Sequence, residues 1–223
     1  MSFNVAVDGP AGAGKSTIAR AVAKKMDLIY VDTGAMYRAM ALFMLKEKAA
    51  LDNTADIAEK CLQADITIRY EDGEQVVVLN GENVNAFLRT EEVGNAASAV
   101  SPVPEVRKKL VELQKRLAAQ SDCIMDGRDI GTCVLPNAQL KIYLTASSAV
   151  RARRRYEELT AKGEACDLQK IQADIEERDY RDMHREVSPL RQAEDAILVD
   201  TSDMSVDEVI SRVAGLCEER HGK

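Results

Sequence analysis

A phosphate-loop pattern near the start of this 223-residue chain lies between an apolar run and a helical one. Residues 9–16 read GPAGAGKS and fit the spacing GxxxxGK[ST]. The preceding FNVAVD is typical of a short buried strand, and the following STIARAVA indicates a helix. The first N–H groups of a helix lack partners within it, so this junction suits an anion. A glycine-rich turn can match the pattern by chance, but the flanking strand and helix favour a nucleoside-triphosphate site.

The residue types in this loop each suit a phosphate ligand. Gly12 and Gly14 permit backbone angles that other residues avoid. Lys15 is long enough to reach the β- and γ-phosphates. Ser16 offers a hydroxyl to Mg²⁺, a hard cation that prefers oxygen, and is our candidate metal ligand. The full set expected to bind the triphosphate is Gly9, Pro10, Ala11, Gly12, Ala13, Gly14, Lys15, Ser16 and Thr17.

The composition narrows the possible classes of protein. The length and the 46% apolar content suit one α/β domain with insertions. A net charge of −7 argues against a general nucleic-acid or anionic-membrane surface, so any anion site is local. Five widely spaced cysteines without a CxxC pair indicate neither a disulfide framework nor a structural zinc site, and two histidines argue against a histidine-built metal site.

Targeting signals are not expected from the sequence. No basic segment followed by an apolar signal core precedes the phosphate loop, and no stretch has ~18 uninterrupted apolar residues. We therefore expect a cytoplasmic protein without a membrane or nucleic-acid partner.

Apolar runs alternate with segments of helical periodicity along the chain. Beyond the first strand, the runs lie at residues 28–32, 123–126, 140–145 and 196–200, and the helical segments lie at 35–48, 105–120, 150–161, 168–184 and 205–219. This alternation predicts an α/β fold with a five-stranded parallel sheet flanked by helices, whose ligands bind at the carboxyl ends of the strands. Residues 66–79, followed by an Asn-Gly turn, predict a small antiparallel β insertion of about residues 63–95.

Arginines gather in two of the predicted helices. Arg178, Arg181, Asp182 and Arg185 form an i, i+3, i+4, i+7 stripe, which suits either phosphate binding or a solvated face in which Arg178 pairs with Asp182. Four more arginines crowd residues 151–155, where either phosphates or the neighbouring glutamates relieve their repulsion. The flexible sequence TAKGE that follows suits a mobile lid.

The segment DGRDIG, at residues 126–131, follows another predicted strand. Its two glycines allow the backbone to approach a ligand, and its Arg128 and Asp129 are chemically suited to bind one. The alternative is a tight loop with an internal ion pair.

Together these segments resemble the bacterial cytidylate kinases, of the nucleoside-monophosphate kinase family, along essentially the whole chain. The matching segments are DGPAGAGKST at 8–17, DTGAMYR at 32–38, RTEEV at 89–93, NAAS at 95–98, DGRDIG at 126–131 and residues 177–185. The resemblance implies a P-loop NTPase fold with a helical lid. It also implies one domain over 1–223, with a core at 1–34, 96–150 and 186–223, a monophosphate-binding region at 35–95 and a lid at about 151–185.

The family resemblance implies transfer of the γ-phosphoryl group of ATP, with Mg²⁺, to CMP or dCMP in pyrimidine nucleotide metabolism. It implies that Asp129 accepts from the cytosine amino group, which uracil replaces with an oxygen. The implied catalytic residues are Lys15, Arg128, Arg151, Arg154 and Arg155. The implied CMP-binding residues are Thr33, Arg38, Ser98, Arg107, Arg128, Asp129, Arg178, Asp182 and Arg185.

Two positions of this chain vary within the family pattern. Two functions other than cytidylate kinase activity also remain as alternatives. Thr33 stands where serine is frequent, and Ser16 stands where many relatives have glycine. The resemblance implies a monomer. The alternatives are a kinase for another monophosphate or for a small metabolite such as shikimate, and a nucleotide-dependent switch. A GTP switch would need an NKxD motif, and the sequence has no Asn-Lys step.

Overall fold

The computed structural model describes residues 2–221, which form two compact units. The phosphate-loop unit comprises residues 3–28 and 123–221, and the middle unit comprises residues 29–122 together with Ser2. The subdivision into core, monophosphate-binding region and lid stays a prediction.

The large sheet has the order β2-β6-β1-β7-β8, which confirms the predicted five strands. Within the phosphate-loop unit, β1 (Asn4–Asp8) pairs in parallel with β6 (Cys123–Gly127) and β7 (Leu140–Thr145), and β7 pairs in parallel with β8 (Ile197–Asp200). The residues of β1 and β6 are almost all buried, as expected for strands covered on both faces. The register sets Asp8 beside Gly127 and Tyr143, so the turns after β1 and β6 begin at the same level.

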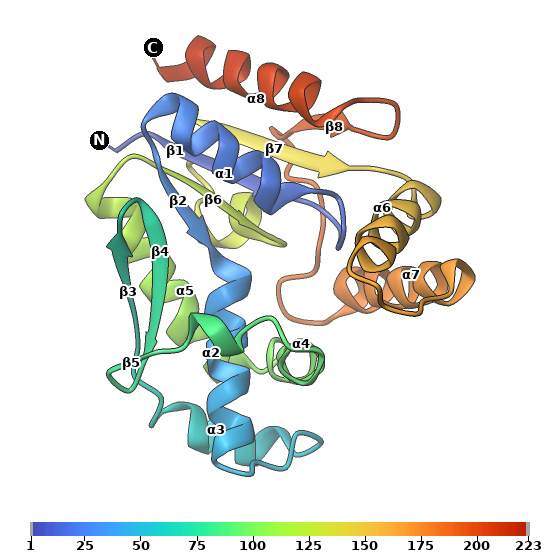
Figure 1. The fold of residues 1–223 in the computed structure, drawn as a ribbon. Coiled ribbons are helices and arrows are strands. Elements are labelled where there is room, and N and C mark those ends of the chain that lie inside the picture. The colour runs from blue at the N-terminus through green and yellow to red at the C-terminus, as the bar shows by residue number, and fades with distance from the viewer. Residues whose placement is uncertain (1, 222–223) are drawn as a thin grey trace. The chain divides into compact units, whose positions relative to one another are not determined.

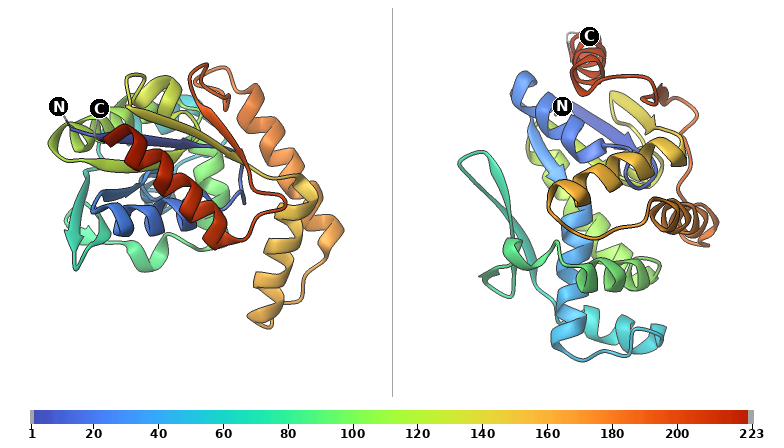
Figure 2. Two further views of the ribbon diagram at one scale, coloured as in Figure 1. Left: turned by 90° about the horizontal axis from the view of Figure 1, so that it is seen from above. Right: turned by 45° about the vertical axis from the view of Figure 1, so that its right-hand side comes forward.

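Helices flank this sheet (Figure 1). They are α1 (Lys15–Met26), the short π-helical turn η2 (Ile130–Val134), α6 (Ser148–Ala161), α7 (Leu168–His184) and α8 (Val206–His221). Helix α1 packs against α8, and α6 lies beside α7, as Figure 2 also shows. The bounds of α6, α7 and α8 lie within two residues of the predicted ones, because capping side chains from Ser147 and Asp167 fix the starts of α6 and α7.

The middle unit combines helices with the small antiparallel sheet. It contains β2 (Ile29–Asp32), α2 (Thr33–Lys46), α3 (Thr54–Cys61), β3 (Ile66–Glu71), β4 (Glu74–Leu79), β5 (Glu82–Asn83), η1 (Asn85–Phe87), α4 (Glu91–Val100) and α5 (Pro104–Gln120). Strands β3, β4 and β5 pair antiparallel, which confirms the predicted hairpin. Its first turn holds Asp72 and Gly73 at positive φ, as a two-residue hairpin turn requires.

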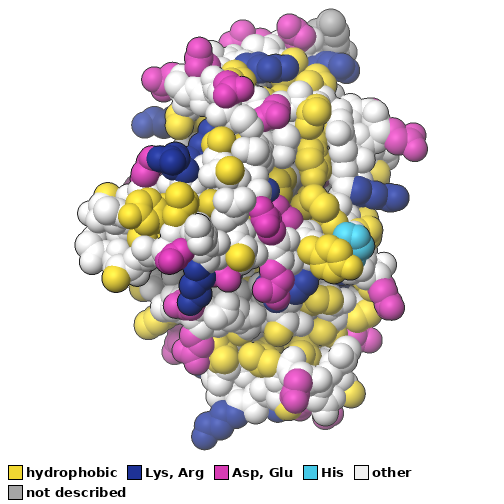
Figure 3. All heavy atoms as spheres, turned by 90° about the vertical axis from the view of Figure 1, so that its right-hand side faces the viewer, with side chains coloured by type: hydrophobic (Ala, Val, Ile, Leu, Met, Phe, Trp, Pro, Cys, Tyr) yellow, Lys and Arg dark blue, Asp and Glu magenta, His cyan; other side chains and the backbone are white. Residues whose placement is uncertain are grey.

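The helices and the surface carry two further observations. Over residues 2–221, none of the helices combines the length and apolar character that crossing a membrane requires. On the face that Figure 3 shows, acidic and basic side chains are interspersed.

Candidate active site

The phosphate loop joins β1 to α1 as the sequence predicts. Gly9 has φ 149° and packs so tightly on β7 that a Cβ would lie 1.9 Å from the Leu144 carbonyl oxygen. Gly12 and Gly14 both have positive φ. Gly14 is the N-cap of α1, and among the described residues no side chain caps this end. The N-terminus of α1 therefore keeps its amide donors and its positive dipole end for an anion.

Lys15 is buried at the first position of α1, where its Nζ donates to the Pro10 carbonyl at 2.7 Å. Burial lowers the pKa of Lys15 well below its usual 10.5, and Arg128 lowers it further, whereas Asp126 and Asp8 act in the opposite sense. A bound polyphosphate would favour the charged ammonium by the same electrostatic argument. Lys15 is thus placed to bind an anion.

Ser16 lies one residue further along α1, next to the end of β6. Its hydroxyl donates to the Asp126 carboxylate at 2.9 Å. These two oxygen-bearing side chains form a small hard-donor set of the kind that Mg²⁺ prefers. Thr17 is exposed on the next position of the helix. Among residues 2–221, no cluster of three or more His, Cys, Asp or Glu side chains could hold a metal by itself.

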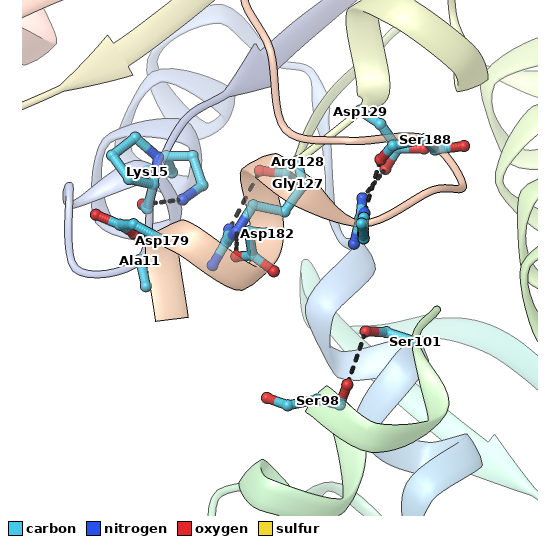
Figure 4. A network of polar contacts seen from close by, with 12 residues as sticks. Ala11, Lys15, Ser98, Ser101, Gly127, Arg128, Asp129, Asp179, Asp182 and Ser188 are labelled. Carbon is cyan, nitrogen blue, oxygen red and sulfur yellow. Dashed lines mark hydrogen bonds and ion pairs between the residues drawn. The ribbon is translucent and has the colours of Figure 1, made fainter. Parts of the chain in front are cut away.

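The DGRDIG segment turns away from the end of β6 and meets α7. Arg128 donates through Nε to the Asp182 carboxylate at 2.9 Å, and its Nη1 donates to the Gly127 carbonyl at 3.3 Å (Figure 4). Burial raises the pKa of Asp182, but Arg128 and, more weakly, Arg178 outweigh it, so the pKa lies below 3.8. The ion-pair partner of Asp182 is thus Arg128, which comes from another element.

Asp129 is also buried in this unit, at 5% exposure. Arg185, directly after α7, has Nη2 3.6 Å from the Asp129 carboxylate and donates through Nε to the Ser188 carbonyl at 2.7 Å. The structure therefore brings together Arg128 with Asp182 and Asp129 with Arg185, from segments more than 50 residues apart. Arg128 and Asp129 thus each have an oppositely charged partner in α7 or directly after it.

The arginines of α6 have three different environments. Arg151 is buried, with Nε donating to the Ala146 carbonyl, Nη1 donating to the phosphate-loop carbonyl of Ala11 at 2.8 Å, and Nη2 2.6 Å from the Asp179 carboxylate. Arg154 donates to the carbonyl and the hydroxyl of Thr201. Arg155 is half exposed and pairs with Glu158 at 2.8 Å. Of these three arginines, Arg155 is the one whose guanidinium lies in an exposed ion pair with a neighbouring glutamate, one of the two alternatives for this crowded segment.

The middle unit carries the other predicted substrate residues, beginning at the junction of β2 and α2. Asp32 caps α2 by accepting from the Ala35 N–H at 2.9 Å, and Thr33 is buried as the first residue of the helix. Arg38, one turn later, donates to the Leu88 carbonyl at 3.1 Å. A Cβ on Gly94 of α4 would lie 3.3 Å from the Arg38 guanidinium, so α4 approaches this arginine closely.

Ser98 and Arg107 lie on α4 and α5 of the same unit. The Ser98 hydroxyl donates to the Gly94 carbonyl, and its own carbonyl accepts from the Ser101 hydroxyl, a bond drawn in Figure 4. Arg107 is buried, donates to the Ser101 carbonyl at 3.3 Å and has its guanidinium carbon 5.6 Å from the Tyr37 ring centroid. This stacking on an aromatic face fixes the plane of the guanidinium.

Sequence reasoning gave no role to four polar side chains that support these residues. Asp126 accepts from Ser16, Asp179 pairs with Arg151, and Asp8 accepts two backbone N–H groups of the DGRDIG segment. Gln75 of β4 binds both the N–H and the carbonyl of Asp32. The one sequence signal available was that Asp8 and Asp126 each end an apolar run, at the ligand-binding edge of a parallel sheet.

Comparison with known proteins agrees with this geometry. A family model described as cytidylate kinase matches residues 5–219. A cytidylate kinase of Caldicellulosiruptor bescii is 49% identical over 96% of this chain and 95% of its own length. One of Listeria innocua is 50% identical over 97% and 96%. An uncharacterized protein of Eubacterium ventriosum shares the fold alone, with a TM-score of 0.53 at 11% identity over 98% of this chain and 100% of its own. Since the family match spans nearly the whole chain, the protein belongs to the cytidylate kinase family.

Proposed function

We propose that this protein transfers the γ-phosphoryl group of ATP to CMP or dCMP, giving ADP and CDP or dCDP. The observation that carries the proposal is the buried Asp129–Arg185 pair in a chain of the cytidylate kinase family. Asp129 lies in the loop after β6, the strand that pairs with β1, and Arg185 directly follows α7. A carboxylate and guanidinium groups complement the N4 amino donor and the N3 and O2 acceptors of cytosine.

The proposed reaction forms a bond between an α-phosphate oxygen of CMP and the γ-phosphorus of ATP. The bond from that phosphorus to the β–γ bridging oxygen breaks, and ADP leaves with the electron pair. The acceptor phosphate is already an anion, so no side chain has to remove a proton from it. The protein therefore contributes mainly positioning and charge stabilisation, and alignment of two bound reactants is worth about 7–11 kcal/mol.

The phosphate loop and Lys15 bind the β- and γ-phosphates in this proposal. Mg²⁺, bound together with ATP, supplies further neutralisation of the phosphate charge. Ser16 would hold the ion, and the bond from its hydroxyl to Asp126 supports the fit because it places two oxygens together. Among the α6 arginines we assign Arg155 to the transferring group. Its present partner, Glu158, is half exposed, so that ion pair is weak and easily exchanged for a phosphate.

The CMP contacts in this proposal are the family's residues. Arg38 and Arg128 bind the monophosphate, with Thr33, Arg178 and Asp182 near phosphate and sugar. Asp129, Ser98, Arg107 and Arg185 read the base. Uracil would turn an oxygen toward the Asp129 carboxylate and leave buried groups unpaired, which discriminates more strongly than a lost apolar contact.

The test is ADP production with Mg²⁺ and ATP and with CMP, dCMP, UMP, AMP or GMP in turn. We expect kcat/KM for CMP to exceed that for UMP by about 10²-fold or more. Asp129→Asn replaces an acceptor by an amide donor that suits uracil O4, so it should shift the preference toward UMP without a matching change in KM for ATP.

Asp203→Asn, at an exposed turn before α8, is the matched control and should leave the preference unchanged. Turnover with another monophosphate alone would overturn the assignment of the base contacts. ATP hydrolysis that is indifferent to every acceptor would overturn the kinase proposal in favour of a switch.

A further inference from the structure

Asp8 is a buried carboxylate that the proposed reaction does not use. It is the last residue of β1 and only 4% exposed. Its Oδ1 accepts the Ile130 N–H at 2.8 Å, and its Oδ2 accepts the Gly131 N–H at 2.7 Å. One carboxylate thus binds two consecutive amides that lie 122 and 123 residues away in the sequence. Two parallel bonds of this kind fix both the position and the rotation of the peptide that they grip.

The gripped amides begin immediately after the pair that is proposed to bind CMP. Ile130 opens η2, and Arg128 and Asp129 are the two residues before it. The space around Gly131 is tight, because a Cβ there would lie 3.1 Å from Lys141 Cδ and 3.3 Å from Asp8 Oδ2, and these side chains would have to move by a few tenths of an ångström. The backbone at Gly131 therefore packs closely against the Asp8 carboxylate.

Two further restraints on the Arg128 and Asp129 side chains come from α7 and from the residue that follows it. Arg128 is bound by Asp182, and Asp129 lies 3.6 Å from Arg185. Asp8, in contrast, belongs to β1, which pairs with a strand on each side within the phosphate-loop unit. It ties the backbone that follows Arg128 and Asp129 to this rigid part of the sheet, where sub-ångström placement can be maintained.

We infer that Asp8 is a positioning residue: by holding the backbone N–H groups of Ile130 and Gly131, it keeps the preceding Arg128 and Asp129 in the geometry that selects cytosine over uracil. The inference rests on the proposed function and deepens it, because it assigns a determinant of base specificity to a side chain that does not touch the base. Asp8 acts through its hydrogen bonds to the backbone N–H groups of Ile130 and Gly131.

The two hydrogen bonds to Asp8, which together we call the grip, require the ionised carboxylate. Burial raises the pKa of Asp8 to about 6, against the lowering effect of the Gly131 and Ile130 N–H groups, while Asp129 raises it and Lys15 lowers it. From β7, Tyr143 lies beside it in register and Lys141 packs over Gly131, held by Asp195. A proton on either carboxylate oxygen replaces an acceptor by a donor and leaves one amide without its bond. The grip therefore weakens as the pH falls through 6.

The decisive experiment is Asp8→Asn, which keeps the shape but turns an NH₂ group toward one of the two amides. Displacing Arg128 and Asp129 by up to about 1 Å lowers the rate of a reaction between positioned groups by about 10- to 100-fold. We therefore expect kcat/KM for CMP to fall by that factor. The CMP-to-UMP ratio should fall about tenfold, while KM for ATP changes by less than about twofold. The wild-type ratio should decline below pH 6, and the ratio of the variant should be flat from pH 5.5 to 8.

Asp195→Asn is the matched control, since it removes an exposed carboxylate from Lys141 near the same loop without touching the grip. It should leave the CMP-to-UMP ratio and its pH profile unchanged. If Asp8→Asn does not fold, Gly131→Ala decides the question, because its methyl group pushes on the same carboxylate; it should lower the ratio in the same direction.

An unchanged base preference in a folded Asp8→Asn, or an equal loss for CMP and UMP, would overturn the inference. So would a selective rise in KM for ATP, which would place Asp8 with the phosphate loop. A wild-type protein that does not phosphorylate CMP is a separate failure, of the proposed function itself, and is visible before any variant is made.

Discussion

Helices α1 and α2 each follow a strand of the large sheet, and their N-termini differ. Helix α2 follows β2 and is capped by the Asp32 side chain. Helix α1 follows β1 through a glycine loop, begins after Gly14 in the left-handed region, and has no side-chain cap among the described residues. An uncapped, acid-free N-terminus costs stability unless an anion occupies it. At α2 the Asp32 side chain satisfies one of the first backbone N–H groups and stabilises the helix end. At α1 these groups stay available to an anion, at a cost in local stability.

The largest expected effect is on the free energy of unfolding, at Arg151, which binds a carbonyl of the phosphate loop from helix α6. Arg151→Ala removes the donor to the Ala11 carbonyl and leaves Asp179 buried without its ion pair. Breaking a buried pair in this way costs about 3–5 kcal/mol, so the free energy of unfolding measured in urea should fall by that amount.

Arg155→Ala is the matched control on the same helix, because its ion pair with Glu158 is exposed. It should change the free energy of unfolding by at most about 1 kcal/mol while lowering kcat. The reverse result, a stable Arg151→Ala with a catalytic defect alone, would contradict the assignment of Arg151 to the support of the loop.

The next largest expected effect is on kcat, at Lys15 at the N-terminus of α1. Lys15→Met removes the cation at the first position of the uncapped helix while keeping an extended apolar chain, and we expect kcat to fall about 10²- to 10³-fold. Lys24→Met, in the last turn of α1, is the control and should leave kcat unchanged. The same coupled assay measures both, and equal losses would show that the effect comes from the helix and not from the phosphate site.

The phosphate-loop unit should also show a pH signature that comes from Asp8. Because the pKa of Asp8 is raised from 3.8 to about 6, the folded state binds a proton that the unfolded state releases. The stability from this group is present below pH 3.8 and is lost as the pH rises through 6. At about 1.36 kcal/mol per pH unit the loss approaches 3 kcal/mol at neutral pH.

Urea unfolding of the wild type and of Asp8→Asn at several pH values measures this directly. The wild type should gain stability relative to the variant as the pH falls from 7.5 to 4.5. A constant difference between the two proteins across that range would show that the carboxyl does not titrate there.

The smallest effect tests the α2 end. Asp32→Ala removes the cap and should lower the free energy of unfolding by about 1 kcal/mol. Asp52→Ala, an exposed acid outside any cap, is the control. Thermal unfolding resolves the two, and a null result for Asp32→Ala would mean that the bonds from Gln75 to the Asp32 backbone hold the junction without the cap.

Most of the fold can be predicted from local sequence patterns. The phosphate loop, the buried runs and the Asp-Gly hairpin turn act within a few residues, so β1, β7 and the hairpin appear where they are predicted. Helices α3 and α4 were not predicted, because α3 is only 8 residues long and α4 contains a glycine and small residues. Their capping residues, Asn53 and Thr90, followed by acidic residues, were the signals that could have found them.

The contacts between the site residues are harder to predict from the sequence than the fold is. The residue types of the loop and of DGRDIG follow from phosphate and base chemistry, but their partners do not. Ser16 finds Asp126 110 residues away, and Arg151 finds Ala11 140 residues away, only because the parallel register brings these segments together. No periodicity in the chain encodes such pairings.

The central claim, that the open end of α1 serves phosphoryl transfer to a cytosine monophosphate, is tested most directly by following the phosphoryl group. ATP labelled in its γ-phosphate is mixed with Mg²⁺, the protein and equal amounts of CMP, UMP, AMP and GMP, and the labelled products are separated. We predict that the label appears in CDP first and predominantly. Label found in inorganic phosphate alone, or mainly in another diphosphate, would contradict the account.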